Sequence, residues 1–314
     1  MKLIVQIPAY NEEATIGQVI KEIPRKIPGI SKVEVLVIDD GSRDKTAEVS
    51  KKAGADYVLR HKRNLGLGTS FKDGCEFALE NGVDILINTD ADNQYPGKYI
   101  SELVKPILEE RADIVIGNRR PWKVQHFSPF KRIMQRFGNW LTRKVSGSSV
   151  PDTVSGFRAY SKEALLRLNV TTKFSYVLDT IVQASHKGLA ILSIPIETNP
   201  PTRKSRLFKN IFQHMKKSGI NILRCFVIYE PFKTFFMGAI ILAIPATILL
   251  IRFLVHYIFN TGAGLVQSLI IMAVLYIFAA LMFVLGILAE LLGTNRKLIE
   301  EQLYLKKKEM FGEG

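Results

Sequence analysis

Two long stretches without charged side chains lie near the carboxyl end, and they limit most what this chain can fold into. Residues 235–251 contain no charged side chain and the apolar character continues to Phe259, while residues 265–289 form a longer stretch that is also uncharged. Each has about the 20 residues that a helix needs to cross a ~30 Å hydrocarbon core. The sequence therefore predicts two transmembrane helices, at residues 232–259 and 265–292, with a buried helical hairpin of a soluble domain as the alternative.

The charges around these stretches predict their orientation. The connection at residues 260–264 has no Lys or Arg. Basic residues lie on the outer sides of both stretches instead, at Lys233, Arg296, Lys297 and Lys306–Lys308. By the positive-inside rule, both termini, a charged tail at residues 293–314 and the domain before the spans lie in the cytosol. Arg252 and His256 oppose this only weakly, because side chains near a helix end can extend to the far interface.

The net charge of +14 is concentrated in two blocks that contain no Asp or Glu, residues 119–144 and 203–224. Such local positive fields suit phosphate groups or anionic lipid. They do not favour a nucleic-acid partner, because they lack interleaved stacking side chains and adjoin the membrane part. Residues 203–231 also mix apolar and basic side chains, which predicts amphipathic juxtamembrane helices in the headgroup layer; a solvated helix packed on the preceding domain is the alternative.

Residues 1–202 alternate between short apolar runs and segments with helical spacing. The runs, which are rich in β-branched residues, predict buried strands at residues 2–8, 33–39, 56–59, 83–88 and 113–117. The segments between them predict helices at residues 12–23, 45–53, 69–80 and 97–110. This alternation predicts an α/β domain with a mostly parallel sheet, in which ligands bind at the carboxyl ends of the strands.

Asp90 and Asp92 follow the fourth predicted strand and are the best indication of chemistry. Two carboxylates at the end of a buried strand can hold one hard cation, and Mg²⁺ retains positions for ligands that the protein does not supply, such as phosphates. An isolated pair of this kind more often only shapes a turn. The surrounding sequence therefore decides between a metal site and a turn.

Polar clusters follow the first, second and fourth predicted strands. They read Pro8-Ala9-Tyr10-Asn11-Glu12, Asp39-Asp40-Gly41-Ser42-Arg43-Asp44 and Asp90-Ala91-Asp92-Asn93-Gln94-Tyr95-Pro96. With these clusters the chain resembles glycosyltransferase family two, which implies a nucleotide-diphosphate-sugar-binding fold of the GT-A type. Further motifs, at residues 117–119, 152–158 and 203–207, look like the polyprenyl-phosphate branch of that family, typified by dolichyl-phosphate mannose synthases.

The resemblance implies a metal site and a donor site. Asp90, Asp92 and Gln94 become ligands of Mg²⁺ or Mn²⁺, and Asp39 becomes an acceptor of hydrogen bonds from the base or ribose. Arg203 and Arg206 are implied to bind the donor diphosphate, because planar guanidinium groups match phosphate oxygens. The alternative for both is a surface positive charge near lipid. Capping of the following helix is the interpretation favoured for Asp44. The donor-binding residues implied are Pro8, Tyr10, Glu12, Asp39, Asn64, Asp90 and Arg206, and the catalytic residues are Asp92 and Arg203.

The resemblance also implies that the first basic block binds the phosphate of a polyprenyl phosphate acceptor. Where the mannose synthase branch has an Arg and a nearby Ser, this chain has Lys131 and Gln135, so we expect the contacts to differ; Lys meets phosphate as a point charge. Orientation of the metal-site loop and a structural salt bridge are the alternatives for Arg158. The acceptor-binding residues implied are Arg119, Lys131, Arg132, Ser155 and Arg158.

The acceptor determines whether a catalytic base is needed. A polyprenyl phosphate is largely ionised at neutral pH, since its second pKa is about 6. We therefore expect direct displacement of a hexose with inversion at the anomeric carbon, without a dedicated general base. Asp179 is the candidate base if the acceptor is instead a glycolipid hydroxyl, and a catalytically silent membrane scaffold is a further alternative. The sequence leaves open the sugar (mannose, glucose or N-acetylglucosamine), the nucleotide (GDP or UDP), the polyprenyl length and the oligomeric state.

Overall fold

The computed structural model describes residues 1–120, 147, 150–170, 176–200, 219–220, 223–224, 226–259 and 265–312. The chain divides into two compact units, each with its own architecture. The first contains residues 1–213 and 300–314, and the second contains residues 214–299.

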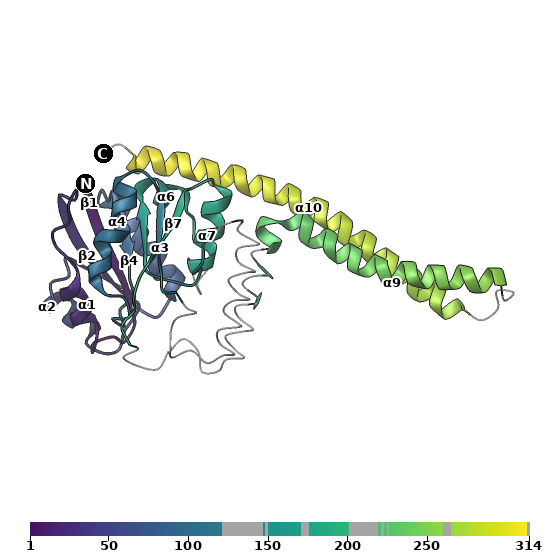
Figure 1. The fold of residues 1–314 in the computed structure, drawn as a ribbon, viewed down its shortest axis with the longest axis horizontal. Coiled ribbons are helices and arrows are strands. Elements are labelled where there is room, and N and C mark those ends of the chain that lie inside the picture. The colour runs from purple at the N-terminus through teal and green to yellow at the C-terminus, as the bar shows by residue number, and fades with distance from the viewer. Residues whose placement is uncertain are drawn as a thin grey trace. The chain divides into compact units, whose positions relative to one another are not determined.

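A seven-stranded sheet forms the centre of the first unit, in the order β3-β2-β1-β4-β6-β5-β7 (Figure 1). The pairings of β1, β2, β3, β4, β5 and β7 with one another are parallel, whereas β6 runs antiparallel to both β4 and β5. The prediction of a mostly parallel sheet is therefore confirmed. The strands are β1 (Lys2–Ala9), β2 (Lys32–Asp39), β3 (Tyr57–Arg60), β4 (Ile85–Asn88), β5 (Ile114–Asn118), β6 (Arg158–Ser161) and β7 (Ile191–Pro195).

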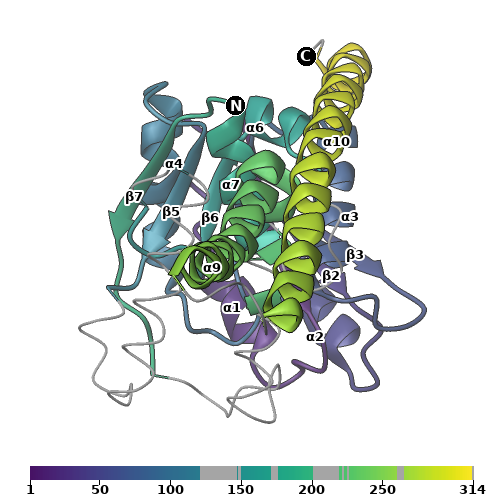
Figure 2. The same cartoon turned by 90° about the vertical axis from the view of Figure 1, so that its right-hand side faces the viewer.

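Helices cover both faces of this sheet, as Figure 1 and the turned view of Figure 2 show. Side chains of α1, α2 and α4 join one buried cluster, and side chains of α3, α6 and α7 join the other. The predicted α/β layering is thus present, with an apolar core on each side of the sheet. The helices are α1 (Ile16–Glu22), α2 (Thr46–Lys52), α3 (Leu67–Glu80), the 3₁₀ helix η1 (Gly97–Tyr99), α4 (Ile100–Leu108), α6 (Lys162–Arg167) and α7 (Tyr176–His186).

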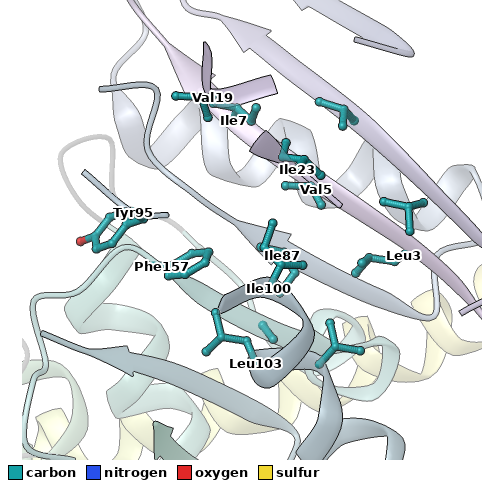
Figure 3. Close-up of a cluster of buried hydrophobic side chains, with 14 of the residues drawn as sticks. Leu3, Val5, Ile7, Val19, Ile23, Ile87, Tyr95, Ile100, Leu103 and Phe157 are labelled. Atoms are coloured by element: carbon teal, nitrogen blue, oxygen red, sulfur yellow. The ribbon is translucent and has the colours of Figure 1, made fainter. Parts of the chain in front are cut away.

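Successive residues of β1 belong to opposite cores. Leu3, Val5 and Ile7 lie in the cluster drawn in Figure 3, together with Leu103 of α4. Ile4, between them in the sequence, belongs to the cluster on the other face, and all four β1 side chains are fully buried. Burial on both faces explains why the central strands appear in the sequence as continuous apolar runs.

The register of the sheet brings the functional segments to one edge. Ala9 of β1 pairs with Asp39 of β2, and Gln6 of β1 pairs with Asn88 of β4. Arg158, the first residue of β6, pairs with Asn88 across the antiparallel ladder. The polar clusters after β1, β2 and β4 and the start of β6 therefore lie at the same edge, where ligands of parallel sheets bind.

The second unit is built on two helices that are each long and apolar enough to cross a membrane. Within the unit they pack closely: a Cβ atom at Gly286 would lie 3.2 Å from Cβ of Phe235, and the hydroxyl oxygens of Thr247 and Tyr276 lie 2.9 Å apart. Many of their large apolar side chains are exposed, which is the surface that a bilayer would cover. The helices are α9 (Pro231–Phe259) and α10 (Val266–Phe311).

The last part of α10, from residue 300 onward, belongs to the first unit. Tyr304 is buried there, and its hydroxyl donates to Glu163 of α6 at 2.9 Å. The Lys307 ammonium donates to the side-chain oxygen of Asn169, also at 2.9 Å. The segment predicted as a charged tail is therefore helical almost to its end, and its last part packs on the α/β fold.

Candidate active site

Asp39 ends β2 and is fully buried. Its Oδ1 atom accepts a hydrogen bond from the N–H of Ser42 at 2.9 Å. Its Oδ2 atom lies 3.2 Å from Nε of Arg60, within ion-pair distance, but accepts no hydrogen bond from any residue that the structure describes. A buried carboxylate oxygen with spare acceptor capacity suits an N–H or hydroxyl group of a nucleoside.

The other donor residues predicted on the first loops lie at the same edge of the sheet. Pro8 is partly exposed, Tyr10 is exposed and Glu12 is buried. Asn64 lies on the loop between β3 and α3, which packs directly on Gly41: a Cβ atom at that glycine would come within 2.8 Å of the Asn64 nitrogen. Gly41 also has a φ of 73°, so both its conformation and its surroundings require glycine.

A cavity of about 340 Å³ lies at the carboxyl ends of β2 and β3. It is lined by Gly41 and Ser42 from the loop after β2 and by Arg60, His61 and Lys62 from the end of β3 and the loop that follows. Through Arg60 and Ser42 it adjoins the Asp39 carboxylate. Its position and polar lining suit part of a nucleotide.

Asp44 stabilises the start of α2. Its carboxylate accepts hydrogen bonds from the N–H groups of Thr46 at 3.0 Å and of Glu13 at 3.2 Å. Burial alone would raise the pKa of Asp44, but a hydrogen bond from the Thr46 hydroxyl, together with these backbone hydrogen bonds, outweighs it and holds the pKa below its usual value. This arrangement agrees with the capping role that the sequence favoured for Asp44.

Asp90 and Asp92 lie on the loop after β4. Asp92 accepts hydrogen bonds from Gln94, to Oδ1 from the backbone N–H at 3.2 Å and to Oδ2 from the side-chain amide at 2.9 Å. Burial of the Asp90 carboxyl group and the neighbouring charges of Asp92 and Glu12 raise the pKa of Asp90 to about 7. A cation bound between these carboxylates would remove the repulsion that raises this pKa.

The oxygens of this loop fit a hard divalent cation. Asp90 and Asp92 offer carboxylates and Gln94 offers an amide oxygen, and Mg²⁺ is usually held by one or two carboxylates together with substrate phosphates and water. Among the residues that the structure describes, no group of three or more His, Cys, Asp or Glu side chains could hold a metal by itself. The set therefore suits a metal that arrives with, or is completed by, a nucleoside diphosphate.

Gly156 links the metal loop to a polar network on the other half of the sheet. A Cβ atom at this residue would lie 3.0 Å from Oδ1 of Asp90 and 3.3 Å from the Tyr176 hydroxyl. The Asn88 amide donates to the Gly156 carbonyl at 2.9 Å and to the Tyr176 hydroxyl at 2.6 Å, and accepts from Gln6 at 3.0 Å. Sequence reasoning missed this network. The one signal for it was Asn88, a polar residue at the end of an apolar strand.

Arg119 follows β5 and is oriented by Asp152. Its Nε and Nη2 atoms donate to the two carboxylate oxygens at 2.8 and 2.9 Å, a bidentate arrangement. Burial would raise the pKa of Asp152, but the hydrogen bonds and charge of Arg119 outweigh it and lower that pKa. The Arg119 side chain keeps 18% of its surface exposed, so it can meet a ligand while Asp152 fixes its direction.

Arg158 and Ser155 are both fully buried. The Arg158 guanidinium donates to the carbonyl oxygens of Ser155, Thr153 and Val177 and to the hydroxyl of Thr180, at 2.8 to 3.1 Å. These bonds tie the loop before β6 to α7. They give Arg158 a structural role at the loop before β6, which is not the loop that carries Asp90 and Asp92. Direct binding of acceptor phosphate by Arg158 stays a prediction that its burial does not favour.

Several predicted residues lie outside the described part of the chain: Lys131, Arg132, Arg203 and Arg206. Most of the predicted juxtamembrane segment at residues 203–231 does so too, although residues 226–229 are helical. Asp179, the candidate base for a hydroxyl acceptor, is buried on α7 close in sequence to Tyr176. Among the predicted residues that the structure describes, Asp39, Glu12, Asp90 and Asp92 lie at one edge of the sheet.

Sequence comparison identifies relatives over the first unit. A family model described as Glycosyl transferase family 2 matches residues 4–168. An uncharacterized protein of Methanocaldococcus jannaschii is 35% identical over 202 residues, which are 63% of this chain and 81% of that protein. A polyprenol monophosphomannose synthase of Mycolicibacterium smegmatis is 27% identical over 206 residues, 62% of this chain and 76% of the relative.

A third relative is a UDP-N-acetylglucosamine–dolichyl-phosphate N-acetylglucosaminyltransferase of Methanococcus voltae, 27% identical over 213 residues, 61% of this chain and 83% of the relative. Among solved structures, glucosyl-3-phosphoglycerate synthase from Mycobacterium tuberculosis, in complex with Mn²⁺, UDP and glucosyl-3-phosphoglycerate, superposes with a TM-score of 0.56 at 21% identity. The superposition covers 72% of this chain and 78% of that one. The fold is therefore of the GT-A type, as predicted.

Proposed function

The chain belongs to glycosyl transferase family 2, and we propose that it transfers a hexose from a nucleotide sugar to a polyprenyl phosphate at the cytosolic face of a membrane. Relatives named as polyprenyl-phosphate and dolichyl-phosphate transferases support the acceptor class. The two long apolar helices support a position at the membrane. Both termini and the α/β domain are assigned to the cytosolic side by the Lys and Arg residues that flank the helices.

One observation carries the proposal: the Asp90 carboxyl group is partly buried near the carboxylates of Asp92 and Glu12, and burial and these charges raise its pKa to about 7. Such an arrangement is unfavourable in an empty turn and favourable around a cation. Asp90, Asp92 and Gln94 are the residues that would hold Mg²⁺ or Mn²⁺. When bound, the metal would supply positive charge against the negative charge that develops on the departing nucleoside diphosphate.

On the donor side, the residues of the edge bind and orient the nucleotide. Asp39 is assigned to accept from the base or ribose, with Pro8, Tyr10, Glu12 and Asn64 around it. The Oδ2 atom of Asp39 is held in place by the backbone bond to its Oδ1 atom, so it needs no rearrangement to accept. Arg203 and Arg206 are assigned to the diphosphate oxygens, which planar guanidinium groups match well.

On the acceptor side, the nucleophile is a phosphate oxygen that is already ionised at neutral pH. A bond forms between this oxygen and the anomeric carbon as the bond from that carbon to the diphosphate oxygen breaks, with inversion and without a proton transfer. Arg119 is assigned to the acceptor phosphate, with Lys131, Arg132 and Ser155. Arg119 and Lys131 then lower the acceptor Michaelis constant by positioning and by charge.

Transfer to lipid tests the proposal directly. Membranes containing the chain are incubated with Mg²⁺, a polyprenyl phosphate and a panel of radiolabelled GDP and UDP sugars, and label is measured in the lipid extract. We expect one donor to label the lipid. Failure of every donor would sink the proposed function, as would labelling that survives removal of the polyprenyl phosphate.

Two variants separate the phosphate acceptor from a hydroxyl acceptor. Asp179→Asn should leave most of the turnover, because no base is needed for a phosphate acceptor. Loss of turnover in this variant, with donor binding intact, would support a hydroxyl acceptor instead. Charge reversal by Arg119→Glu should raise the Michaelis constant for polyprenyl phosphate more than that for the donor; the reverse order would remove the Arg119 assignment.

A further inference from the structure

His61, the first residue after β3, lies between two carboxylates. Its Nδ1 atom is 2.8 Å from Oδ1 of Asp40, in hydrogen-bond geometry. Its Nε2 atom is 3.1 Å from Oδ2 of Asp73 on α3, within ion-pair distance although not aligned for a hydrogen bond. Because a carboxylate only accepts, the hydrogen bond to Asp40 is donated by the imidazole ring. Only 8% of the His61 side chain is exposed, so these contacts are shielded from water.

Asp40 uses the same carboxylate to hold the loop between β3 and α3. Its Oδ1 atom accepts from the N–H of Leu65 at 2.8 Å, and its Oδ2 atom accepts from the N–H of Gly66 at 2.9 Å. Gly66 is the residue directly before α3. Asp40 therefore holds both ends of the loop, at His61 and at the start of α3, against the end of β2.

His61 adds the connection that Asp40 alone lacks. Through Asp73 it reaches the body of α3, whereas Asp40 reaches only residues just before that helix. An edge of His61 also lines the cavity beside Asp39. The loop that it fixes carries Asn64, a donor-binding residue in the proposed function, and packs on Gly41 with no room for a side chain.

From this geometry we propose that His61 is a positioning residue for the donor nucleotide. By bridging Asp40 and Asp73 it fixes the loop of residues 61–66, whose first two residues line the nucleotide cavity, before any ligand binds. A preformed wall lowers the conformational cost of donor binding. The inference rests on the proposed function, because it takes the cavity to be occupied by the nucleoside diphosphate part of the donor.

Nucleotide binding to the full chain tests the inference. The chain is purified in detergent with Mg²⁺, and the dissociation constants of GDP and UDP are measured by titration calorimetry. For the nucleotide that the unmodified chain binds, we expect His61→Gln to weaken binding roughly tenfold, the effect typical of a hydrogen bond to a charged group. Asp73→Asn should weaken it less. The double variant should be no weaker than His61→Gln, because both changes break the same bridge.

Turnover provides a readout that a purely structural role would not move. The donor Michaelis constant should rise in His61→Gln, while kcat and the acceptor Michaelis constant remain close to those of the unmodified chain. His186→Gln is the matched control, since it makes the same substitution at an exposed histidine of α7. Thermal unfolding of each variant shows whether it is folded, and Asp73→Asn, at a residue that is 29% exposed, keeps the test available if His61→Gln unfolds.

The outcomes separate the inference from the proposed function. If the unmodified chain binds neither GDP nor UDP, the proposed function fails and the inference fails with it. If it binds one of them and His61→Gln binds it equally well, only the positioning role is overturned. Additive effects of His61→Gln and Asp73→Asn would also overturn it, because the two residues would then act separately.

Discussion

The two halves of the sheet edge hold their charged side chains in opposite ways. On the donor half, after β1, β2 and β4, carboxylates accept hydrogen bonds chiefly from neutral backbone N–H groups, as Asp39 does from Ser42 and Asp40 does from Gly66. Each also has one basic side chain nearby, Arg60 beside Asp39 and His61 beside Asp40. On the other half, near β5 and β6, arginines donate to oxygens, as Arg119 does to Asp152. Neutral donors fix a carboxylate without cancelling its charge, whereas a carboxylate partner cancels the charge of the arginine that it orients.

This difference shows in the pKa values of two aspartates. Burial and the nearby carboxylates raise the pKa of Asp90, on the donor half, to about 7. The pKa of Asp152, on the other half, is lowered because Arg119 outweighs its burial. The loop that carries Asp90 and Asp92 therefore has negative charge that a metal can neutralise.

The largest effect should come from removing charge at the metal loop. Asp92→Asn keeps the size of the side chain but replaces a carboxylate oxygen with an amide, so we expect kcat to fall by at least about a hundredfold. Radiolabel transfer to lipid measures the rate. Glu76→Gln, at an exposed residue of α3, is the control; equal rates in the two variants would remove the metal assignment.

A large effect on stability, and not on binding, is expected at Arg158, on the half of the sheet edge near β5 and β6. Arg158→Met removes a buried guanidinium and leaves the carbonyl oxygens of Thr153, Ser155 and Val177 without that donor. We expect the free energy of unfolding to fall by about 3 kcal/mol, since each buried polar group left unpaired costs free energy. Urea unfolding followed by near-UV circular dichroism measures it.

Arg111→Met is the matched control for this prediction, because Arg111 has an exposed side chain paired with exposed Glu109. Its loss should change the free energy of unfolding by less than about 1 kcal/mol. If Arg158→Met were as stable as the control but bound polyprenyl phosphate poorly, Arg158 would be an acceptor ligand and not a support of the loop. Arg158 would then be an exception to the difference between the two halves of the sheet edge.

Metal affinity should depend on pH through Asp90. Below about pH 7 this carboxyl group is protonated, and a metal must displace the proton, so the apparent dissociation constant for Mn²⁺ should rise about tenfold for each pH unit below 7. Without metal, Asp90 has a higher pKa in the folded chain than its usual 3.8, so the fold loses stability as the pH rises through about 7. Titration of Mn²⁺ between about pH 5 and pH 8, a range that brackets this pKa, tests the direction in which the affinity changes with pH. Asp90→Asn should bind more weakly and without this dependence; a flat profile in the unmodified chain would contradict the prediction.

Much of the fold could be predicted because its signals are local. The five predicted strands correspond to β1 to β5. Buried apolar residues run through β1, β2, β4 and β5, whereas β3 lies at an edge of the sheet and is only partly buried. The strand β6 was missed because it is short and begins with Arg158, a charged residue that is buried only through contacts with α7 and the preceding loop. The strand β7 was also missed; like β3, it lies at an edge of the sheet and its side chains are only partly buried.

The site could be predicted only as far as it follows strand ends. Asp39, Asp90 and Asp92 stand directly after apolar runs, so the sheet itself places them at one edge. The partners that fix them come from distant parts of the chain: Tyr176 lies 88 residues from Asn88, to which it is hydrogen-bonded. A contact of this kind depends on how α7 packs, and no local pattern encodes it.

The smallest effect should come from the network where the two halves meet. Tyr176→Phe removes the hydroxyl that accepts from the Asn88 amide at 2.6 Å, but the same amide still donates to the Gly156 carbonyl at 2.9 Å. The stacking of the Tyr176 ring on Phe71 is also retained, because it needs only the ring. The Tyr176 hydroxyl also donates to the Gly156 carbonyl at 3.2 Å, so the variant loses two neutral hydrogen bonds. We therefore expect the free energy of unfolding to fall by about 2 kcal/mol. Because Gly156 contacts the Asp90 carboxylate, Mn²⁺ affinity should fall slightly as well, by about threefold. Urea unfolding and Mn²⁺ titration of the same sample measure both. If stability fell while Mn²⁺ affinity stayed unchanged, the Tyr176 network would stabilise the fold without positioning the metal loop. The donor half would then hold its metal loop independently of the half near β5 and β6.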